Sequence, residues 1–418
     1  MTKLEKKDIK TPFYYVRNRL LKNKPAMFGL IVIVLAHIIA LLGYCIMPDD
    51  TPYADDRSPH IKKEAPGFQV LLLRTLKQRE VEKVNFLEYI FFGQESEYKI
   101  EPISWYEING YTIRYIIYGR DKEVLTQPLI STVKKVYSGF SVNLKPDSAT
   151  GYNYSIRGDQ VQYLDLNEKI HSITRAELIK EFEEKNLEKR TYLLGTSIDG
   201  RDFISMLLFG TKISLSIGFI AVIISLILGV SLGALAGFFG GWIDNSIMWL
   251  MTVVWSIPSI MLVIAISLAL QSKGIWVAFV AVGLTMWVEA ARVVRGQIMS
   301  IREKLFVEAA KALGIGNLRI IFFHILPNLL GPIIVIATAN FATAILVEAG
   351  LSFLGLGVQP PMPSWGKMVA EGYVSNWESD GGYLVFMPSA FICLLVFAFN
   401  LFGNGLRDAY DPQSSNKW

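Results

Sequence analysis

The sequence predicts an all-α polytopic membrane protein of six transmembrane helices, with an α+β domain inserted between the first two. Of its 418 residues, 52% are hydrophobic and only 19% are charged. The apolar residues gather into blocks long enough to cross the roughly 30 Å hydrocarbon core of a bilayer, which takes about 20 helical residues. Between the first two blocks, strand and turn signals predict a folded extramembrane segment.

The charge and cysteine content agree with this class. The net charge is only +4, and the lysines and arginines cluster beside the apolar blocks, which favours a membrane protein over a nucleic-acid-binding one. Cys45 and Cys393 both fall in or at apolar runs, so we expect no disulfide framework.

The predicted helices divide the chain into regions. The transmembrane helices are expected at 26–47, 213–239, 247–270, 274–290, 331–356 and 383–402. The first block is too long for a secretory signal peptide and has no cleavage site, so we expect a retained helix. The remaining regions are a basic N-terminus (1–25), an inserted domain (48–192), a helical core (193–412) with a loop at 292–330, and a tail (413–418).

Basic residues beside short loops predict the orientation. Those before the first block are Lys3, Lys6, Lys7, Lys10, Arg17, Arg19, Lys22 and Lys24. The loop at 292–330 is also rich in arginine and lysine. Both should therefore be cytoplasmic, with the C-terminus on the same side and residues of about 48–208 outside.

The inserted segment carries local signals of an α+β domain. Hairpin turns are expected at Asn109-Gly110 and at Gly158-Asp159, which separate alternating residues. Thr174 and Glu177 form a possible capping box for an amphipathic helix. The face of that helix should contain Leu178, Ile179 and Phe182.

A row of glycines marks the second predicted helix. Gly229, Gly233, Gly237 and Gly241 recur every four residues, so they lie on one helical face. In lipid, rows of small residues let helix backbones pack closely. The partner could be another helix of this chain or a second subunit.

The residues indicate no built-in energy source, catalytic site or metal site. The predicted spans hold few ionisable residues, which disfavours a proton pathway. No GxxxxGK[ST] phosphate loop is present, so we expect no ATP or magnesium to be bound by this chain. His60 and His171 have no metal-ligand spacing, and the insert is expected to be non-enzymatic. A transporter of this composition would need a partner that supplies energy.

The loop at 292–330 predicts a helix–turn–helix. Helical propensity favours a helix over 302–313, and Gly314 is placed as its C-cap. Asn317 could cap a second short helix, which Pro327 would end or kink. Such a knob could transmit force to another protein; the residues equally allow a plain amphipathic loop at the membrane surface.

The same loop resembles a family motif. Glu308-Ala309-Ala310, Gly314 and Leu326-Pro327 match the EAA signature of bacterial ABC importer permeases, EAA-x3-G-x9-I-x-LP. His324 stands in place of the isoleucine, and the ending HILPN is similar to the oligopeptide, dipeptide and nickel branch.

Three further stretches resemble the C-type subunit of that branch. They cover 193–215, 348–368 and 403–412. Ser197, Met206, Lys212 and Asn404 depart from the family pattern. The likeness runs closely over 193–412, loosely over the first helix, and leaves out most of the insert.

The resemblance implies a type I permease bundle in the bacterial inner membrane, energised by other subunits. It implies an ATPase-coupling role for Glu308, Ala309, Ala310, Ala312, Leu313, Gly314, Ile315, Gly316, Asn317, Leu326 and Pro327. It also places a family motif near the outer face at Gly200, Arg201, Asp202, Glu348 and Trp365.

The implied partners are a homologous second permease in a heterodimer, two ABC ATPases that bind ATP and magnesium, and an extracytoplasmic solute-binding protein. Lipid surrounds the spans, and no nucleic acid is expected. The implied function is import of oligopeptides or dipeptides by alternating access. The alternatives are a nickel or other small-solute permease or, in a different class, a membrane-anchored extracytoplasmic sensor or enzyme or a self-sufficient carrier.

Overall fold

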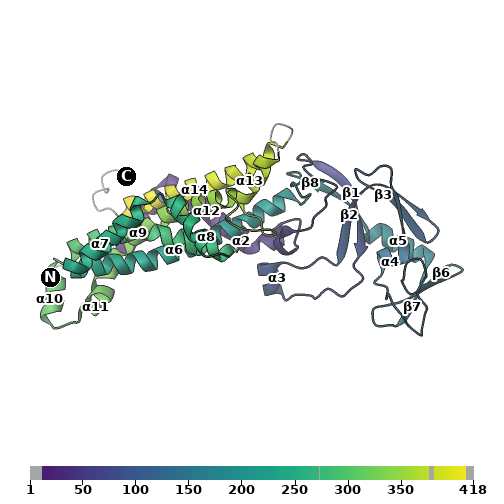
Figure 1. Ribbon diagram of the computed structural model, residues 1–418, viewed down its shortest axis with the longest axis horizontal. Coiled ribbons are helices and arrows are strands. Elements are labelled where there is room, and N and C mark those ends of the chain that lie inside the picture. Colours follow the sequence, from purple (N-terminus) through teal and green to yellow (C-terminus); the bar gives the residue numbers. More distant parts are fainter. Residues whose placement is uncertain (1–11, 273, 376–380, 411–418) are drawn as a thin grey trace, which may run out of the picture. The chain divides into compact units, whose positions relative to one another are not determined.

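The computed structural model describes residues 12–272, 274–375 and 381–410, and it divides into two compact units (Figure 1). The first unit comprises 1–40, 210–373 and 385–418 and is helical; the second comprises 41–209 and 374–384 and contains the strands. Lys3, Lys6, Lys7, Lys10 and the tail 413–418 lie outside the described residues, and so does the end of the 403–412 motif.

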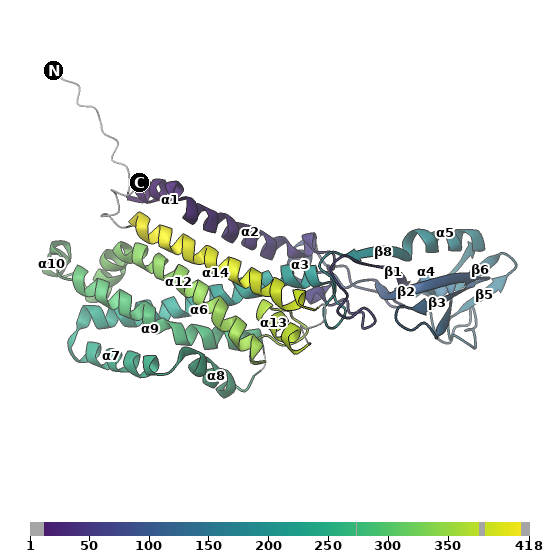
Figure 2. The ribbon, with the colours of Figure 1, turned by 90° about the horizontal axis from the view of Figure 1, so that it is seen from above.

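The first unit is a bundle of long helices that lie side by side (Figure 2). Five described helices are long and apolar enough to span a membrane, and a bent pair makes a sixth candidate. The helices are α1 (Pro12–Lys22), α2 (Lys24–Ile46), α6 (Phe203–Phe239), α7 (Gly241–Ser256), α8 (Ser259–Ala269), α9 (Ile275–Ile301), α10 (Leu305–Ala312), α11 (Asn317–Ile320), α12 (Leu330–Phe353), α13 (Trp365–Val374) and α14 (Tyr383–Tyr410).

The third predicted helix, at 247–270, is not a single helix but a bent pair. Helix α7 ends at Ser256, α8 begins at Ser259, and the two are bent by 94°. Pro258 disfavours a helical conformation in the residue before it, and Ile257 is extended, with φ −91° and ψ 128°. The steric demand of this proline therefore interrupts an apolar run that a hydropathy pattern reads as continuous.

Three other helices extend beyond their predicted ends. Helix α6 begins ten residues before 213, at Phe203; α9 continues past 290 to Ile301, and α14 past 402 to Tyr410. Hydropathy detects the stretch that matches the bilayer thickness, whereas helical hydrogen bonding continues through polar residues outside it. In α9, Arg292 and Arg295 lie inside the helix, so the loop predicted to begin at 292 begins after Ile301.

The glycine row packs helix α6 against α9 of the same chain. A Cβ atom added at Gly233 would lie 2.4 Å from the carbonyl oxygen of Ala291, and one at Gly237 would lie 2.7 Å from that of Arg295. Gly229 meets Trp287 and Ala290 in the same way. These three glycines therefore serve packing within the chain, which was one of the two predicted alternatives.

Gly241 does not belong to this row, contrary to the prediction. Helix α6 ends at Phe239, and Gly240 and Gly241 both adopt positive φ, 67° and 56°, in the turn into α7. A Cβ added at Gly241 would contact nothing within 4 Å. The four-residue spacing continues in the sequence, but the helix that would place Gly241 on the packing face has already ended.

The second unit is built on a five-stranded antiparallel sheet in the order β4-β3-β2-β1-β8, with a three-stranded sheet β5-β6-β7 beside it. The strands are β1 (Phe68–Leu76), β2 (Tyr98–Asn109), β3 (Thr112–Ile117), β4 (Val124–Pro128), β5 (Tyr154–Arg157), β6 (Gln160–Leu164), β7 (Ile170–Thr174) and β8 (Leu187–Tyr192). Three helices accompany them: α3 (Phe86–Phe92), α4 (Leu129–Val133) and α5 (Arg175–Lys185). Phe68 pairs with Tyr192, so the chain enters and leaves this sheet at adjacent points.

Both predicted hairpins are confirmed. Arg157 pairs with Gln160 across Gly158-Asp159. In the other hairpin Asn109 pairs with Thr112, so the turn lies one residue later than predicted, at Gly110-Tyr111. Asn109 takes part in the ladder because its partner strand begins at Thr112.

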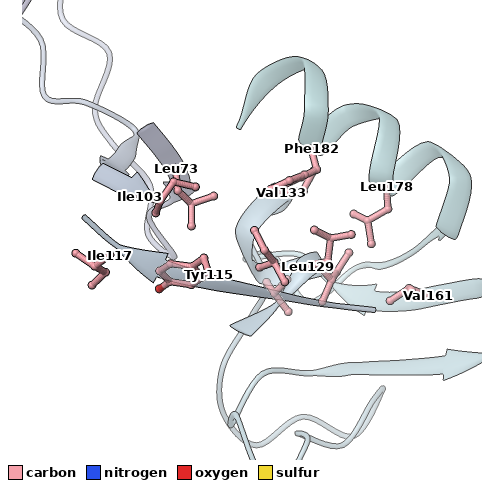
Figure 3. Packing of buried hydrophobic residues seen from close by; sticks show 12 residues of the cluster. Leu73, Ile103, Tyr115, Ile117, Leu129, Val133, Val161, Leu178 and Phe182 are labelled. Atoms are coloured by element: carbon pink, nitrogen blue, oxygen red, sulfur yellow. The ribbon is translucent and has the colours of Figure 1, made fainter. Parts of the chain in front are cut away.

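The predicted capping box of helix α5 is confirmed and positions the core of the second unit. The Thr174 hydroxyl accepts the N–H of Glu177, and the Glu177 carboxylate accepts the N–H of Thr174. The helix is thereby held with Leu178 and Phe182 pointing into a cluster with Leu129 and Val133 of α4 and the strands (Figure 3). These side chains are fully or almost fully buried.

We expect Gly233→Ala to loosen the bundle, because its methyl group would meet the α9 backbone. Overpacking of this kind typically costs about 1–3 kcal/mol, so the apparent melting temperature of the protein in detergent should fall. Gly296→Ala in α9 is the matched control, since a Cβ there meets nothing within 4 Å. The control should be neutral or slightly stabilised through helix propensity. Equal melting temperatures for the two variants would contradict the packing described above.

Candidate functional site

The predicted knob forms between α9 and α12 as helix α10, a turn and helix α11. Gly314 adopts φ 74° at the end of α10. Its N–H donates to the carbonyl of Lys311, and the N–H of Ile315 donates to that of Ala310. This pair of bonds is a Schellman motif, which satisfies the last helical carbonyls and favours glycine at the left-handed position. The predicted C-cap role of Gly314 is therefore confirmed.

One detail of the predicted knob is wrong. Gly316, not Asn317, is the N-cap of α11, and its carbonyl accepts the N–H of Ile320. Of the two alternatives predicted for Pro327, an end or a kink of the helical path, the structure excludes an end. The chain passes through a π-helical turn (Ile321–Ile325) and a 3₁₀ turn (Leu326–Leu329) directly into α12. Proline has no N–H to donate, and the changed hydrogen-bond pattern around it lets the helical path continue.

The inner face of the knob is anchored in the bundle by an apolar cluster. The buried members are Ala234, Phe238, Val294, Ile298, Val307, Ala310, Ile320, Ile321, Ile325 and Leu329. They come from α6, α9, α10, α11 and the turns before α12. Because both short helices share this cluster with two long ones, the knob is held as part of the bundle.

Polar contacts at the same end of the bundle add to this anchoring. The Arg295 guanidinium of α9 donates two hydrogen bonds to the Asp244 carboxylate of α7, at 2.5 and 2.7 Å. Arg302 donates to the carbonyl of Gly237 at 3.1 Å, and the ammonium of Lys311 lies 5.3 Å from the Phe238 ring centroid. Bidentate pairing fixes direction as well as distance, so α6, α7, α9 and α10 are tied together.

The outer face of the knob is exposed and apolar. Leu313 is 80% exposed and Phe323 is 74% exposed. Leu305, Leu318 and Phe322 are also exposed. Large apolar side chains gathered on one protrusion are typical of a protein–protein contact. Together, Leu305, Leu313, Leu318, Phe322 and Phe323 are called the knob surface below.

The predicted coupling residues divide between the two faces. Those exposed on the outer side are Glu308, Ala309, Ala312, Leu313, Gly314, Gly316, Asn317 and Pro327; Ala310 is buried, and Ile315 and Leu326 are half-buried. The prediction missed Leu318, Phe322 and Phe323, because the run LRIIFF has the composition of a buried helix. The four-residue spacing of Leu318 and Phe322 places them on one face, but nothing in the sequence says that this face is open.

The knob lies at the same end of the bundle as α1 and the C-terminal end of α14 (Figures 1 and 2). This end also carries Arg17, Arg19, Lys22, Arg302, Lys304 and Arg407. Concentration of basic residues at one end of a transmembrane bundle is the pattern of a cytoplasmic face.

The predicted family motif near the outer face is distributed over both units. Glu348 and Trp365 belong to the first unit, and Gly200, Arg201 and Asp202 to the second. Glu348 is fully buried and accepts a hydrogen bond from Ser352 at 2.8 Å. Trp365 packs edge-on against Phe391 of α14, at 5.7 Å between ring centroids.

In the second unit the motif organises the start of helix α6. The Arg201 guanidinium is buried and pairs with Asp55 at 3.2 Å. The Asp202 carboxylate accepts the N–H of Ser205 at 2.8 Å, which makes it the N-cap of α6. The geometry assigns these residues a structural role here.

Two further acidic groups lie around this motif and are partly or wholly shielded from water. Asp49 accepts hydrogen bonds from Thr51 and from the N–H of Asp56, and burial raises its pKa. Burial, followed by the nearby charge of Asp49, raises the pKa of Asp56 from 3.8 to about 6. Burial also raises the pKa of Asp202. Among these carboxyls, Asp56 therefore changes its charge in mildly acidic solution.

Comparisons with known proteins agree with the motif. A family model described as "Binding-protein-dependent transport system inner membrane component" matches residues 229–416. A second, "N-terminal TM domain of oligopeptide transport permease C", matches residues 11–66. Neither covers the segment 67–228, in which the strands lie.

Two curated relatives match along most of their own length. The dipeptide transport system permease protein DppC of Alkalihalophilus pseudofirmus is 45% identical over 219 residues, 52% of this chain and 71% of the relative. The oligopeptide transport system permease protein OppC of Bacillus subtilis is 38% identical over 224 residues, 54% of this chain and 72% of the relative. A structure of the MetNI methionine ABC transporter in an inward-facing conformation covers 50% of this chain and 97% of its own, at 19% identity and a TM-score of 0.40.

The raised pKa of Asp56 predicts a pH-dependent gain in stability from Asp56→Asn. The folded protein holds this proton more tightly than the unfolded chain, so the carboxyl stabilises the fold below its usual pKa of 3.8. That contribution is lost as the pH rises through about 6. Removing the charge should stabilise the fold by at most about 2–3 kcal/mol at about pH 8, by roughly half as much at about pH 5, and hardly at all below the usual pKa of 3.8. The measurement is the apparent melting temperature relative to wild type at each pH.

Asp121→Asn, at an exposed position in the same unit, is the control. It should leave the melting temperature unchanged at each pH. A difference in melting temperature between Asp56→Asn and wild type that does not change with pH would contradict the assignment.

Proposed function

The chain belongs to the inner-membrane permeases of binding-protein-dependent transport systems, in the C-type branch of the oligopeptide and dipeptide ABC importers, and on this basis we propose that it forms half of a pathway for peptides. It is a multi-pass membrane protein and a transport subunit, not an enzyme. The permeases it resembles carry dipeptides and oligopeptides by name. Peptides are therefore the proposed substrate class, with nickel or another small solute as the alternative.

In the proposed architecture six helices cross the inner membrane as a type I permease bundle, with the α7–α8 pair as the third. Both termini and the knob face the cytoplasm, and residues of about 48–208 face outward. The end that holds the knob, α1 and the end of α14 carries the basic residues, as the positive-inside rule requires. The insert then forms a separate domain on the outer side.

The observation that supports the proposal most strongly is that the knob has one face buried in the bundle and one exposed apolar face. Its inner face is fixed to α6 and α9 by the buried cluster, and its outer face presents the knob surface. A stiff protrusion transmits a rigid-body movement of a docked partner to the helices that hold it. We assign to the coupling residues named above, with Glu308 and Gly314 foremost, the contact with an ATPase subunit.

The proposed assembly supplies what this chain does not carry. Two ATPases bind ATP and magnesium and close around the nucleotide; a homologous second permease completes the pathway; a solute-binding protein delivers peptide on the outer side. Alternating access follows when closure of the ATPases rocks the two bundles. An anchored sensor, an enzyme or a self-sufficient carrier would leave the knob surface without a partner, and isolation of the chain together with two ATPase chains distinguishes the importer from these.

We expect Gly314→Ala to impair transport more than Gly316→Ala. Both glycines are exposed and a Cβ at either meets nothing within 4 Å, but only Gly314 has a left-handed φ. An alanine there costs about 1–2 kcal/mol, which lowers the equilibrium constant for the capped conformation roughly tenfold. Peptide uptake and transport-coupled ATP hydrolysis in reconstituted vesicles should both fall for Gly314→Ala. Equal activity of the two variants would count against a coupling role for the cap.

Glu308→Gln tests the acidic contact on the outer face. Removal of this charge should weaken ATPase binding while the helix stays intact, because Glu308 is exposed. A loss of about 1 kcal/mol or more is expected for a charge in a protein interface. Glu303→Gln, an exposed acid outside the motif, is the control. The measurement is the amount of ATPase that co-purifies, and retention at the wild-type level in Glu308→Gln would remove Glu308 from the interface.

A further inference from the structure

Helix α3 of the second unit buries none of its seven residues, although six of them, in FLEYIFF, are apolar or aromatic. Phe86 is 71% exposed and Leu87 is 69% exposed. Residues four apart share a helical face, so Phe86 lies with Ile90, and Leu87 with Phe91. A short helix with such a face in water is costly, since exposed apolar surface is unfavourable in proportion to its area.

Helix α3 is held in a defined place by its opposite side. The Tyr89 hydroxyl donates to the carbonyl of Tyr44 at 2.9 Å and lies 3.2 Å from the carboxylate of Asp50. The N–H of Gln94 donates to the carbonyl of Asp50 at 3.1 Å. Gly93, at φ 76°, permits this approach, because a Cβ there would lie 2.6 Å from the Asp50 carbonyl oxygen.

These contacts place α3 at the level where a membrane-spanning helix ends. Tyr44 is two residues from the end of α2 at Ile46, about 3 Å along the helix axis. Helix α2 has 23 residues, and about 20 cross the hydrocarbon core. Tyr44 therefore lies near the boundary between hydrocarbon and headgroups.

The surroundings of α3 have the composition of a membrane interface. Tyr44, Tyr53 and Tyr89 are linked by hydrogen bonds, and tyrosines are enriched at this depth. On α2, Leu41 and Ile46 are exposed in the same unit, so this end of the helix, to which Tyr89 of α3 is bonded, also presents apolar side chains.

We propose that α3 is an interfacial anchor helix whose apolar face inserts into the leaflet at the C-terminal end of α2. This is the outer leaflet in the topology proposed above. The single charged residue of α3 is compatible with insertion, because Glu88 turns back to accept the N–H of Asn85 at the start of the helix. Two attachments, the chain connection to the spans and this helix, then hold the inserted domain at the membrane.

The test measures the depth of α3 in the full chain. Cys45→Ser and Cys393→Ser remove the native thiols, and Leu87→Cys carries a nitroxide label in vesicles of phosphatidylethanolamine and phosphatidylglycerol. Ile170→Cys is the control, because Ile170 is exposed on β7 of the same unit, at the opposite end of that unit from α3 (Figures 1 and 2). Collision rates with oxygen, which concentrates in lipid, and with a polar nickel chelate are then compared.

We expect nickel-chelate collisions at position 87 to be about tenfold rarer than at position 170, and oxygen collisions to be more frequent, since polar solutes are excluded from hydrocarbon. Frequent nickel collisions at position 87 would show a water-exposed helix and overturn the proposal. Infrequent collisions with both reagents and an immobilised spectrum would show a protein contact and also overturn it.

A second variant tests the attachment. Gly93→Ala in the Leu87→Cys background should raise the nickel collision rate at the label, because the added Cβ displaces α3 from Asp50. Gly110→Ala should not, since Gly110 has a similar φ of 64° but no neighbour within 4 Å of its added Cβ. An unchanged rate in Gly93→Ala would show that the contact with Asp50 does not set the depth of α3.

Discussion

The contact between α6 and α9 is the interaction on which the rest of the bundle depends. Gly229, Gly233 and Gly237 bring the two backbones so close that even a methyl group would collide with the opposite chain. In a membrane the hydrophobic effect does not hold helices together, so close packing and polar contacts must do so. Beyond the last of these glycines, the same two helices form the surface on which the knob packs. They contribute Phe238 and Ile298 to its buried cluster.

The knob is held rigid by its packing on α6 and α9 and by the hydrogen bonds that cap its helices. Capping hydrogen bonds at Gly314 satisfy the carbonyls of α10, and buried Val307 and Ile320 tie α10 and α11 to one cluster. Arg295 connects the cluster region to α7 through Asp244. A movement imposed on the knob surface therefore reaches at least three long helices without an intervening flexible segment. The side of the knob left open is the side on which the proposed ATPase partner would dock.

The inserted domain is stabilised differently from the helical bundle, by a hydrophobic core of the kind found in water-soluble proteins. Its core is a conventional one, with Phe182 and Leu178 of α5 packed over strands and α4, and it closes where Phe68 meets Tyr192. The exposed apolar residues of α3 take no part in that core, and Tyr89 of the same helix bonds to Tyr44 near the end of α2. An insertion tethered only by its ends would be free to turn, whereas a helix that partitions into lipid restrains it.

What the sequence determined by itself was set by neighbours along the chain. Apolar blocks of bilayer length identified the spans, the box of Thr174 and Glu177 located α5, and the spacing from Glu308 to Pro327 identified the loop and, by resemblance, its family. The local signal of Gly314 was sufficient because a C-cap involves only the last turn of one helix. The structure alone decided the break at Pro258, the departure of Gly241 from the glycine row, and the exposure of Phe323 and Leu87. An apolar residue reads the same in a sequence whether it meets another helix, lipid or a partner, and only the tertiary arrangement determines which surface is covered.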